Sequence, residues 1–371
     1  MLQSRVAAGA ARVARAAGRV VHTARLSTKP PPTVAVVTPL DNPALKDAPF
    51  GEPDVAEFLV GGDLETMLAH GERLRSAEAL LWIPPGDTGL LRELVRGGHM
   101  PNLKWAHGFY AGIDPIAAFA REDLQPAGVP LSNGRGAFST SLAEYAMYAA
   151  MHFIKQVPRC MENRRTKTWD KFVMGEMKGL TLGLVGAGSI AQATAALGRA
   201  FGMRTIALRR NARKEDAASS AFDLVLGPYD GPILPAHKRA LFEQCDVVVC
   251  TLPGTPETYH FVGHAELEAM PPGAVFVSLG RGVAVDEAAV DAALRRGRLG
   301  GVALDVYETE PLPADSPLWD PAHGERLLMT SHNADFTESY FREGWRVWRD
   351  NLDAFRTGRP PATPIDPEAG Y

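Results

Sequence analysis

The sequence predicts an α/β protein that contains two separate parallel sheets. Short apolar runs alternate with helical patterns along most of the 371 residues, and this order is typical of parallel strands that are joined by helices. A longer helical pattern at 139–157 divides the runs into two series, and a glycine-rich turn opens the second. A composition of 46% hydrophobic and 22% charged residues is that of a globular protein with room for two domains.

The first series begins directly after a proline-rich stretch. It predicts strands at 33–37, 79–83 and 103–107 and helices at 54–75 and 90–96. The long helix at 139–157 is indicated by Leu142, Ala146, Ala149 and Phe153, because this spacing places all four on one helix face.

The second series predicts a larger sheet. Its strands are expected at 181–185, 205–208, 247–250, 274–278, 301–306 and 327–329. A final helix at 337–355 carries the aromatic residues Phe341, Trp345 and Trp348, four and three positions apart. We interpret that aromatic face as core packing, and we expect the helix to return the chain to the first sheet.

The glycine turn lies between the first strand of the second series and a helix. Gly186 and Gly188 permit a tight turn and a close approach of the backbone to a ligand, and Ala191 takes the third place of the Gly-x-Gly-x-x-Ala pattern. The free N–H groups of the following helix favour a phosphate. The pattern predicts dinucleotide binding, and the alternative is a glycine turn that only joins the strand to the helix.

The residues after the next strand bear on the choice of dinucleotide. NAD-binding proteins usually carry an acidic residue there for the ribose hydroxyl groups, whereas this chain has Arg209 and Arg210, followed by Arg213 and Lys214. A guanidinium group pairs well with a 2′-phosphate. We therefore expect NADP(H), with NAD(H) as the alternative. These residues could also form an ordinary solvent-exposed basic turn that binds no cofactor.

Three residues follow the ends of later strands: Arg281, Glu310 and His332. Parallel sheets bind ligands at the carboxyl ends of their strands. Each residue alone could be an ordinary surface or core residue, but together they suit the reduction of a 2-oxo acid. The histidine donates a proton, the carboxylate keeps it protonated, and the arginine holds the substrate carboxylate.

From about Leu80 to Asp350, the chain resembles the D-isomer-specific 2-hydroxyacid dehydrogenases. The motifs that carry the resemblance are 186–190 (Gly-Ala-Gly-Ser-Ile), 250–258 (Cys-Thr-Leu-Pro-Gly-Thr-Pro-Glu-Thr), Arg281-Gly282 and 300–306 with Glu310-Pro311-Leu312. The resemblance implies two Rossmann-like domains. A dinucleotide-binding domain at 139–335 would be inserted into a flavodoxin-like substrate domain at 33–138 plus 336–371.

The resemblance also implies roles for individual residues. Arg281, Glu310 and His332 would be the catalytic residues, and Ala111 and Gly112 would bind the substrate carboxylate together with Arg281. The implied cofactor-binding residues are Gly186, Gly188, Ser189, Ile190, Arg209, Arg210, Thr251, Leu252, Leu279, Gly280 and Asp305. A homodimer is implied as well. The sequence departs from the family around His332, where Ser331, Asn333 and Asp335 replace the usual residues, so the substrate preference is expected to differ.

The expected activity is reduction of a small 2-oxo acid, such as glyoxylate or hydroxypyruvate, to a D-2-hydroxy acid. The alternative is a catalytically weak regulatory protein that senses dinucleotides. A net charge of −4 gives no indication of nucleic-acid binding, and no apolar run approaches the ~18 residues of a membrane helix. Cys160, Cys245 and Cys250 show no metal-binding spacing, and no metal is expected.

The first 32 residues are interpreted as a transit peptide and linker. Arg5, Arg12, Arg15, Arg19 and Arg25 lie among alanines, and no acidic residue precedes Asp41. This composition is typical of an organelle presequence. We expect the mitochondrial matrix, with the chloroplast or a disordered basic tail as alternatives.

Overall fold

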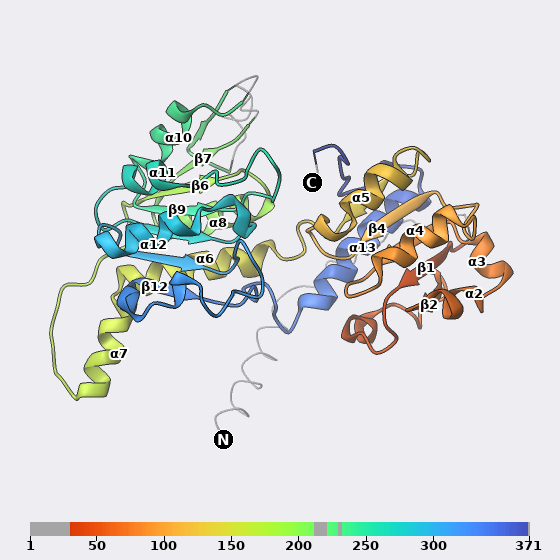
Figure 1. Ribbon diagram of the computed structural model, residues 1–371, viewed down its shortest axis with the longest axis horizontal. Coiled ribbons are helices and arrows are strands. Elements are labelled where there is room, and N and C mark those ends of the chain that lie inside the picture. Colours follow the sequence, from red (N-terminus) through yellow and green to blue (C-terminus); the bar gives the residue numbers. More distant parts are fainter. Residues whose placement is uncertain (1–29, 211–220, 229–231, 370–371) are drawn as a thin grey trace. The chain divides into compact units, whose positions relative to one another are not determined.

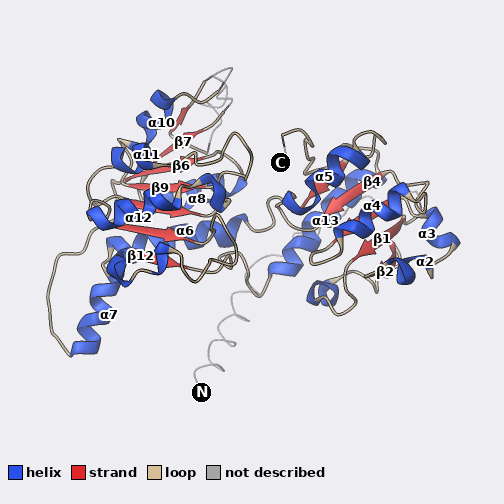
Figure 2. Cartoon of the chain, in the orientation of Figure 1, coloured by secondary structure: helices blue, strands red, loops and turns tan. Residues whose placement is uncertain are grey.

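The computed structural model describes residues 30–210, 221–228 and 232–369. It contains two sheets, of five and seven strands, in which every pair of neighbouring strands is parallel (Figures 1 and 2). The predicted fold class is confirmed. The predicted presequence and the basic residues Arg213 and Lys214 lie outside the described residues.

The five-stranded sheet has the order β2-β1-β3-β4-β5, which is the flavodoxin-like order. Its strands are β1 (Thr33–Val37), β2 (Glu57–Gly61), β3 (Ala79–Trp82), β4 (Trp105–Gly108) and β5 (Leu131–Asn133). One face packs against apolar side chains of α2 (Leu64–Leu68), α3 (Glu72–Ser76), α4 (Thr88–Arg96) and α5 (Ala117–Phe119). The other face packs against α13 (Tyr340–Arg356) and the 3-10 helix η1 (Pro43–Asp47).

The seven-stranded sheet has the order β12-β11-β10-β9-β6-β7-β8. Its strands are β6 (Thr181–Val185), β7 (Arg204–Leu208), β8 (Leu224–Leu226), β9 (Val247–Cys250), β10 (Val275–Ser278), β11 (Gly301–Leu304) and β12 (Leu327–Met329). The chain order reverses between β6 and β9, and ligands bind at such a switch point in open α/β sheets. The glycine turn after β6 therefore stands where a ligand is expected.

Helices cover both faces of this sheet. Apolar residues of α6 (Ser139–Ile154) and α8 (Ser189–Ala200) pack on one face, and those of α10 (Pro235–Phe242), α11 (His264–Ala269) and α12 (Glu287–Arg296) pack on the other. The strands are apolar throughout because both of their faces are covered. Cys250 is completely buried at the end of β9.

The aromatic face of α13 lies in the core of the five-stranded sheet. Trp348 is completely buried and its ring stacks on that of Trp105 in β4, with 6.4 Å between the centroids. Trp345 Nε1 donates a hydrogen bond to the carbonyl oxygen of Ala44 (2.8 Å). The last helix thus returns the chain to the first sheet, as its aromatic pattern predicted.

The predicted helix at 54–75 is wrong. The segment contains β2, then α2 and α3. Phe58, Leu59 and Val60 favour a strand, and parallel pairing of β2 with β1 stabilises it. The predicted helix at 139–157 ends earlier, at Ile154, because Gln156 adopts a left-handed conformation (φ of 52°) and a second helix, α7 (Val157–Thr166), follows.

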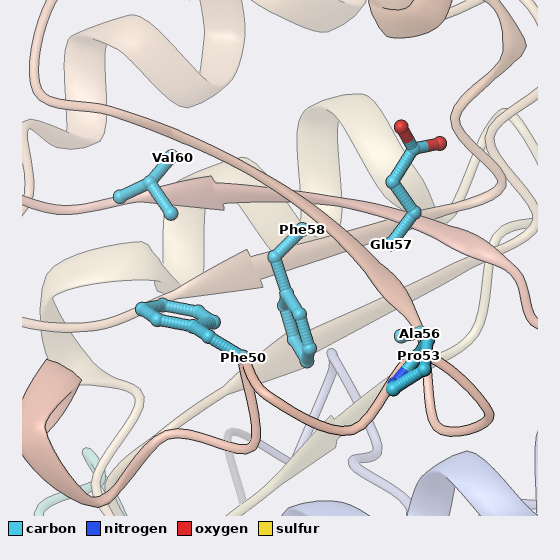
Figure 3. Close-up of a pocket in the computed structure, with 6 residues that line it drawn as sticks. All are labelled: Phe50, Pro53, Ala56, Glu57, Phe58 and Val60. Atoms are coloured by element: carbon cyan, nitrogen blue, oxygen red, sulfur yellow. The ribbon is translucent and has the colours of Figure 1, made fainter.

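A surface pocket of about 390 Å³ lies beside β2 (Figure 3). The rings of Phe50 and Phe58 meet edge to face, with 5.0 Å between their centroids, while the Glu57 carboxylate points away from them. No predicted site residue lines this pocket. Within the described part of the chain, none of the helices has the length and apolar character needed to cross a membrane.

Candidate active site

The glycine turn joins β6 to α8 and has the shape that a phosphate group requires. Gly186 has a φ of 104°, which favours glycine, and its N–H donates to the carbonyl oxygen of Leu208 in β7 (2.9 Å). A Cβ atom added at Gly188 would meet no atom within 4 Å. No side chain caps the first turn of α8, which begins at Ser189 and Ile190. The turn therefore offers open space and unpaired N–H groups, and both fit the diphosphate of a dinucleotide.

Two further predicted segments lie next to this turn. Thr251 follows β9, and its hydroxyl donates to the carbonyl oxygen of Val185 (3.2 Å). The carbonyl oxygen of Leu252 accepts a hydrogen bond from the backbone N–H of Arg281 (3.0 Å), which connects Leu252 to the segment 279–281. The structure thus brings the predicted residues 251–252 and 279–280 together beside the glycine turn.

Arg209 and Arg210 directly follow β7. The backbone N–H of Arg209 donates to the carbonyl oxygen of Leu226 in β8 (2.9 Å), which fixes the start of the arginine pair beside the glycine turn. The guanidinium of Arg210 forms an ion pair with Glu257. Neither position carries the acidic side chain that is typical of NAD-binding proteins.

His332 and Glu310 form a hydrogen-bonded pair. The distance from His332 Nδ1 to Glu310 Oε2 is 2.7 Å, and Glu310 Oε1 accepts from the backbone N–H of Tyr307 (3.0 Å). The hydrogen bond to Glu310 raises the pKa of His332 above its ordinary value against the opposing effect of burial. Burial opposes ionisation of Glu310, but its hydrogen bonds with His332 and Tyr307 outweigh burial and lower its pKa. The pair therefore stabilises a protonated imidazole next to a carboxylate.

The loop that carries His332 is held by Asp305. His332 has a left-handed backbone (φ of 50°), and its N–H donates to the carbonyl oxygen of Asp305 (2.8 Å). The buried carboxylate of Asp305 accepts from the hydroxyl of Thr330 (2.6 Å) and from the N–H groups of Asn333 (3.0 Å) and Ala334 (3.2 Å). The hydrogen bonds of Asp305 thus fix the loop 330–334. The contact between Asp305 and a cofactor remains a prediction.

Arg281 lies against the predicted substrate-binding backbone. A Cβ atom added at Gly112 would lie 1.6 Å from Arg281 Nη2, so the guanidinium occupies the space that any side chain at 112 would need. Arg281 Nε donates to Asp114 Oδ2 (3.1 Å) and Nη1 donates to the carbonyl oxygen of Gly280 (3.1 Å). The guanidinium is therefore fixed beside Ala111 and Gly112, which could hold a carboxylate with their N–H groups.

The sequence profile of the D-isomer specific 2-hydroxyacid dehydrogenase, NAD binding domain matches residues 147–334, more than half of the chain. The chain belongs to this dehydrogenase family. The resemblance noted in the sequence is therefore confirmed, and the protein is an NAD(P)-dependent oxidoreductase of the D-2-hydroxyacid dehydrogenase family.

Individual relatives agree with this assignment. The chain is 30% identical to a glyoxylate reductase of Korarchaeum cryptofilum, over 80% of this chain and 85% of that protein. It is 31% identical to a glyoxylate/hydroxypyruvate reductase B of an Enterobacter species, over 68% of this chain and 74% of the relative. Among solved structures, a probable 2-hydroxyacid dehydrogenase of Rhizobium etli, in complex with NADP, HEPES and L(+)-tartaric acid, matches with 25% identity and a TM-score of 0.70, covering 92% of this chain and all of the other.

Several residues around the candidate site were not predicted, among them Asp114 and Tyr145. Asp114 pairs with Arg281, although the two are 167 positions apart in the sequence. Tyr145 in α6 forms a hydrogen bond with the hydroxyl of Thr330 (2.9 Å) and so reaches the histidine loop. Asp114 could have been found from its place just beyond the carboxyl end of β4. No sequence signal marks Tyr145, because it lies within an ordinary helical pattern.

Proposed function

We propose that this dehydrogenase reduces a small 2-oxo acid, such as glyoxylate or hydroxypyruvate, to the D-2-hydroxy acid with NADPH. The observation that carries the proposal is the hydrogen bond between His332 Nδ1 and Glu310 Oε2 (2.7 Å), in a site whose Arg281 guanidinium lies against Gly112. The names of the curated relatives, a glyoxylate reductase and a glyoxylate/hydroxypyruvate reductase, support the substrate class.

Each residue has a role that follows from its surroundings. When bound, a reduced nicotinamide dinucleotide supplies the hydride that adds to the carbonyl carbon of the 2-oxo acid. Arg281 and the backbone N–H groups at 111–112 hold the substrate carboxylate and orient the carbonyl group. His332 donates its proton to the carbonyl oxygen as negative charge develops there, and Glu310 keeps the imidazole protonated and oriented before that step.

We assign the preference for NADPH to Arg209. It directly follows β7, where an acidic residue would repel a 2′-phosphate, and a guanidinium group can pair with that phosphate. The NADP complex of the Rhizobium etli relative supports this choice. Arg209→Asp is expected to lower kcat/KM with NADPH about tenfold or more and to improve the use of NADH, since an ion pair is replaced by repulsion. Wild-type enzyme that clearly prefers NADH would contradict the proposal.

The decisive experiment is a panel of 2-oxo acids assayed with both cofactors. Glyoxylate and hydroxypyruvate are expected to be reduced, and chiral analysis should find the D product from hydroxypyruvate. His332→Ala is expected to lower kcat by about 10²–10⁴-fold, the usual contribution of a general acid, with unchanged affinity for NADPH in a fluorescence titration. If no 2-oxo acid is reduced, or if His332→Ala retains full turnover, the proposed reaction is refuted.

We also propose that the enzyme is a homodimer built through α6, α7 and the segment 167–176. No residue of α7 is buried. Large apolar side chains are exposed here, including Met161 (65%), Trp169 (100%) and Val173 (89%), and such a patch indicates a protein interface. Trp169→Glu should produce monomers in sedimentation experiments. Leu40→Glu, a matched change at an exposed apolar residue on another surface, should leave the dimer intact.

A further inference from the structure

Tyr145 in α6 is hydrogen-bonded to the loop that carries His332, although 185 positions separate it from its partner Thr330. The distance between the two hydroxyl oxygens is 2.9 Å. The hydroxyl of Thr330 in turn donates to Oδ1 of Asp305 (2.6 Å), whose carboxylate also accepts from the backbone N–H groups at 333–334. A chain of hydrogen bonds therefore leads from α6 to the residues on both sides of His332.

The direction of each hydrogen bond in this chain follows from the groups that form it. A carboxylate can only accept, so the single hydrogen of the Thr330 hydroxyl points to Asp305. The oxygen of Thr330 must then accept, and the hydroxyl of Tyr145 is its donor. Such a donation polarises the Thr330 hydroxyl and strengthens its hydrogen bond to the carboxylate. Tyr145 therefore supports the contact between Thr330 and Asp305.

The carboxylate of Asp305 depends on these donors. Asp305 is 1% exposed, and no ion pair within the described ranges of the chain involves it. A buried charge without a cation is costly unless hydrogen bonds compensate for the lost water. Each donor that Asp305 loses therefore weakens its hold on the loop 330–334, which keeps His332 in its left-handed conformation.

We propose that Tyr145 is a positioning residue that acts on His332 through the hydroxyl of Thr330. This inference rests on the proposed function, in which His332 donates a proton to the substrate. With Tyr145 in place, the histidine loop keeps one conformation and the imidazole stays against Glu310. Without the tyrosine hydroxyl, the Thr330 side chain is free to rotate away from Asp305, and the imidazole is correctly oriented for a smaller part of the time.

The experiment compares Tyr145→Phe with Tyr148→Phe. Both variants remove one hydroxyl from α6 and keep the ring, and the two rings lie 6.3 Å apart. Tyr148 is the matched control because its side chain is exposed and, in the part of the chain that the structure describes, makes no hydrogen bond to the histidine loop. Tyr145→Phe should lower kcat about three- to tenfold, the contribution of one neutral hydrogen bond. Tyr148→Phe should retain the wild-type kcat.

The comparison of kcat with KM separates positioning from a general structural defect. Arg281 and the backbone at 111–112 lie on other segments, so KM for the 2-oxo acid should be retained in Tyr145→Phe. The affinity for NADPH in a fluorescence titration should be retained as well. A partly unfolded variant would instead lose substrate and cofactor binding together with kcat, and that result would overturn the inference.

Variants of Thr330 test the proposed route. Thr330→Val removes both hydrogen bonds of the side chain and should lower kcat more than Tyr145→Phe does, whereas Thr330→Ser keeps the hydroxyl and should retain most of the activity. In Thr330→Val the acceptor for Tyr145 is absent, so the addition of Tyr145→Phe should cause no further loss. Two losses that multiply would show that Tyr145 does not act through Thr330, and the inference would be wrong.

Hydrogen exchange tests the positioning role without an activity assay. The backbone N–H groups at 332–334 donate to Asp305, so their exchange in the substrate-free enzyme should be faster in Tyr145→Phe and unchanged in Tyr148→Phe. Equal exchange and equal kcat in the wild type and Tyr145→Phe would overturn the inference, while reduction of glyoxylate by both would leave the proposed function intact. A wild-type enzyme that reduces no 2-oxo acid would instead refute the proposed function, and the exchange rates would still decide whether Tyr145 holds the loop.

Discussion

Replacing Glu310 with glutamine should move the pH range in which this dehydrogenase reduces its substrate. Glu310 raises the pKa of His332, and the proposed reduction requires the protonated imidazole. Activity is therefore present below the raised pKa and lost as the pH rises through it. Glu310→Gln keeps the size of the side chain but removes its charge, so the pKa of His332 should fall and activity should be lost at a lower pH.

The size of this shift follows from the geometry of the pair. The groups are in hydrogen-bond contact at 2.7 Å, but the side chains of His332 and Glu310 are 41% and 35% exposed. Charges in close contact interact by about 1 kcal/mol in water and about 4 kcal/mol near a protein surface. Since solvent screens this pair, we take about 1.4 kcal/mol, which corresponds to about one pH unit.

The assay is kcat/KM for the best 2-oxo acid across the neutral and alkaline pH range, with an NMR titration of His332 as an independent readout. Glu308→Gln is the matched control. Glu308 lies two residues away but forms its hydrogen bond with His260 (3.0 Å), so its removal should leave the pH profile in place. If Glu310→Gln leaves the alkaline limb of the pH profile and the pKa of His332 unchanged, Glu310 does not raise the pKa of His332. The proposed role of Glu310 would then be wrong.

Three further predictions address the cofactor turn, the core and the N-terminal segment. Gly188→Ala should leave thermal stability unchanged, since the φ of −74° at this position suits any residue. The added methyl group should fill the open space and weaken NADPH binding about tenfold or more. A fluorescence titration that gives the same NADPH affinity for the variant and the wild type would contradict this prediction. Trp348→Ala should lower the free energy of unfolding by about 3–5 kcal/mol in a denaturant titration, and a loss below about 1 kcal/mol would show that the core collapses around the gap. Residues 1–28 fused to a fluorescent protein should direct it to mitochondria, and a diffuse cytosolic signal would refute the predicted targeting.

The sequence predicted the larger sheet better than the smaller one. Strands such as β6 and β9 are continuous apolar runs bounded by turn residues, so their local pattern was sufficient. β2 was missed because Glu57–Gly61 becomes a strand through its pairing with β1, a long-range interaction that local periodicity does not record. β5 was also missed, because two of its three residues are polar and leave no apolar run.

The same distinction applies to the site. Arg281, Glu310 and His332 could be predicted because each follows a strand of one parallel sheet, and the topology then brings such residues to one edge. The pairing of Arg281 with Asp114 depends on two loops that follow strands of different sheets.

The backbone of His332 has a consequence for how the enzyme can evolve. A left-handed conformation in a residue other than glycine or asparagine costs about 1–3 kcal/mol, and the interactions of Asp305 maintain it. Glycine at 332 would relieve this strain, yet it would remove the proposed proton donor and its hydrogen bond with Glu310. Backbone strain and the proposed catalytic role therefore make opposite demands on this position.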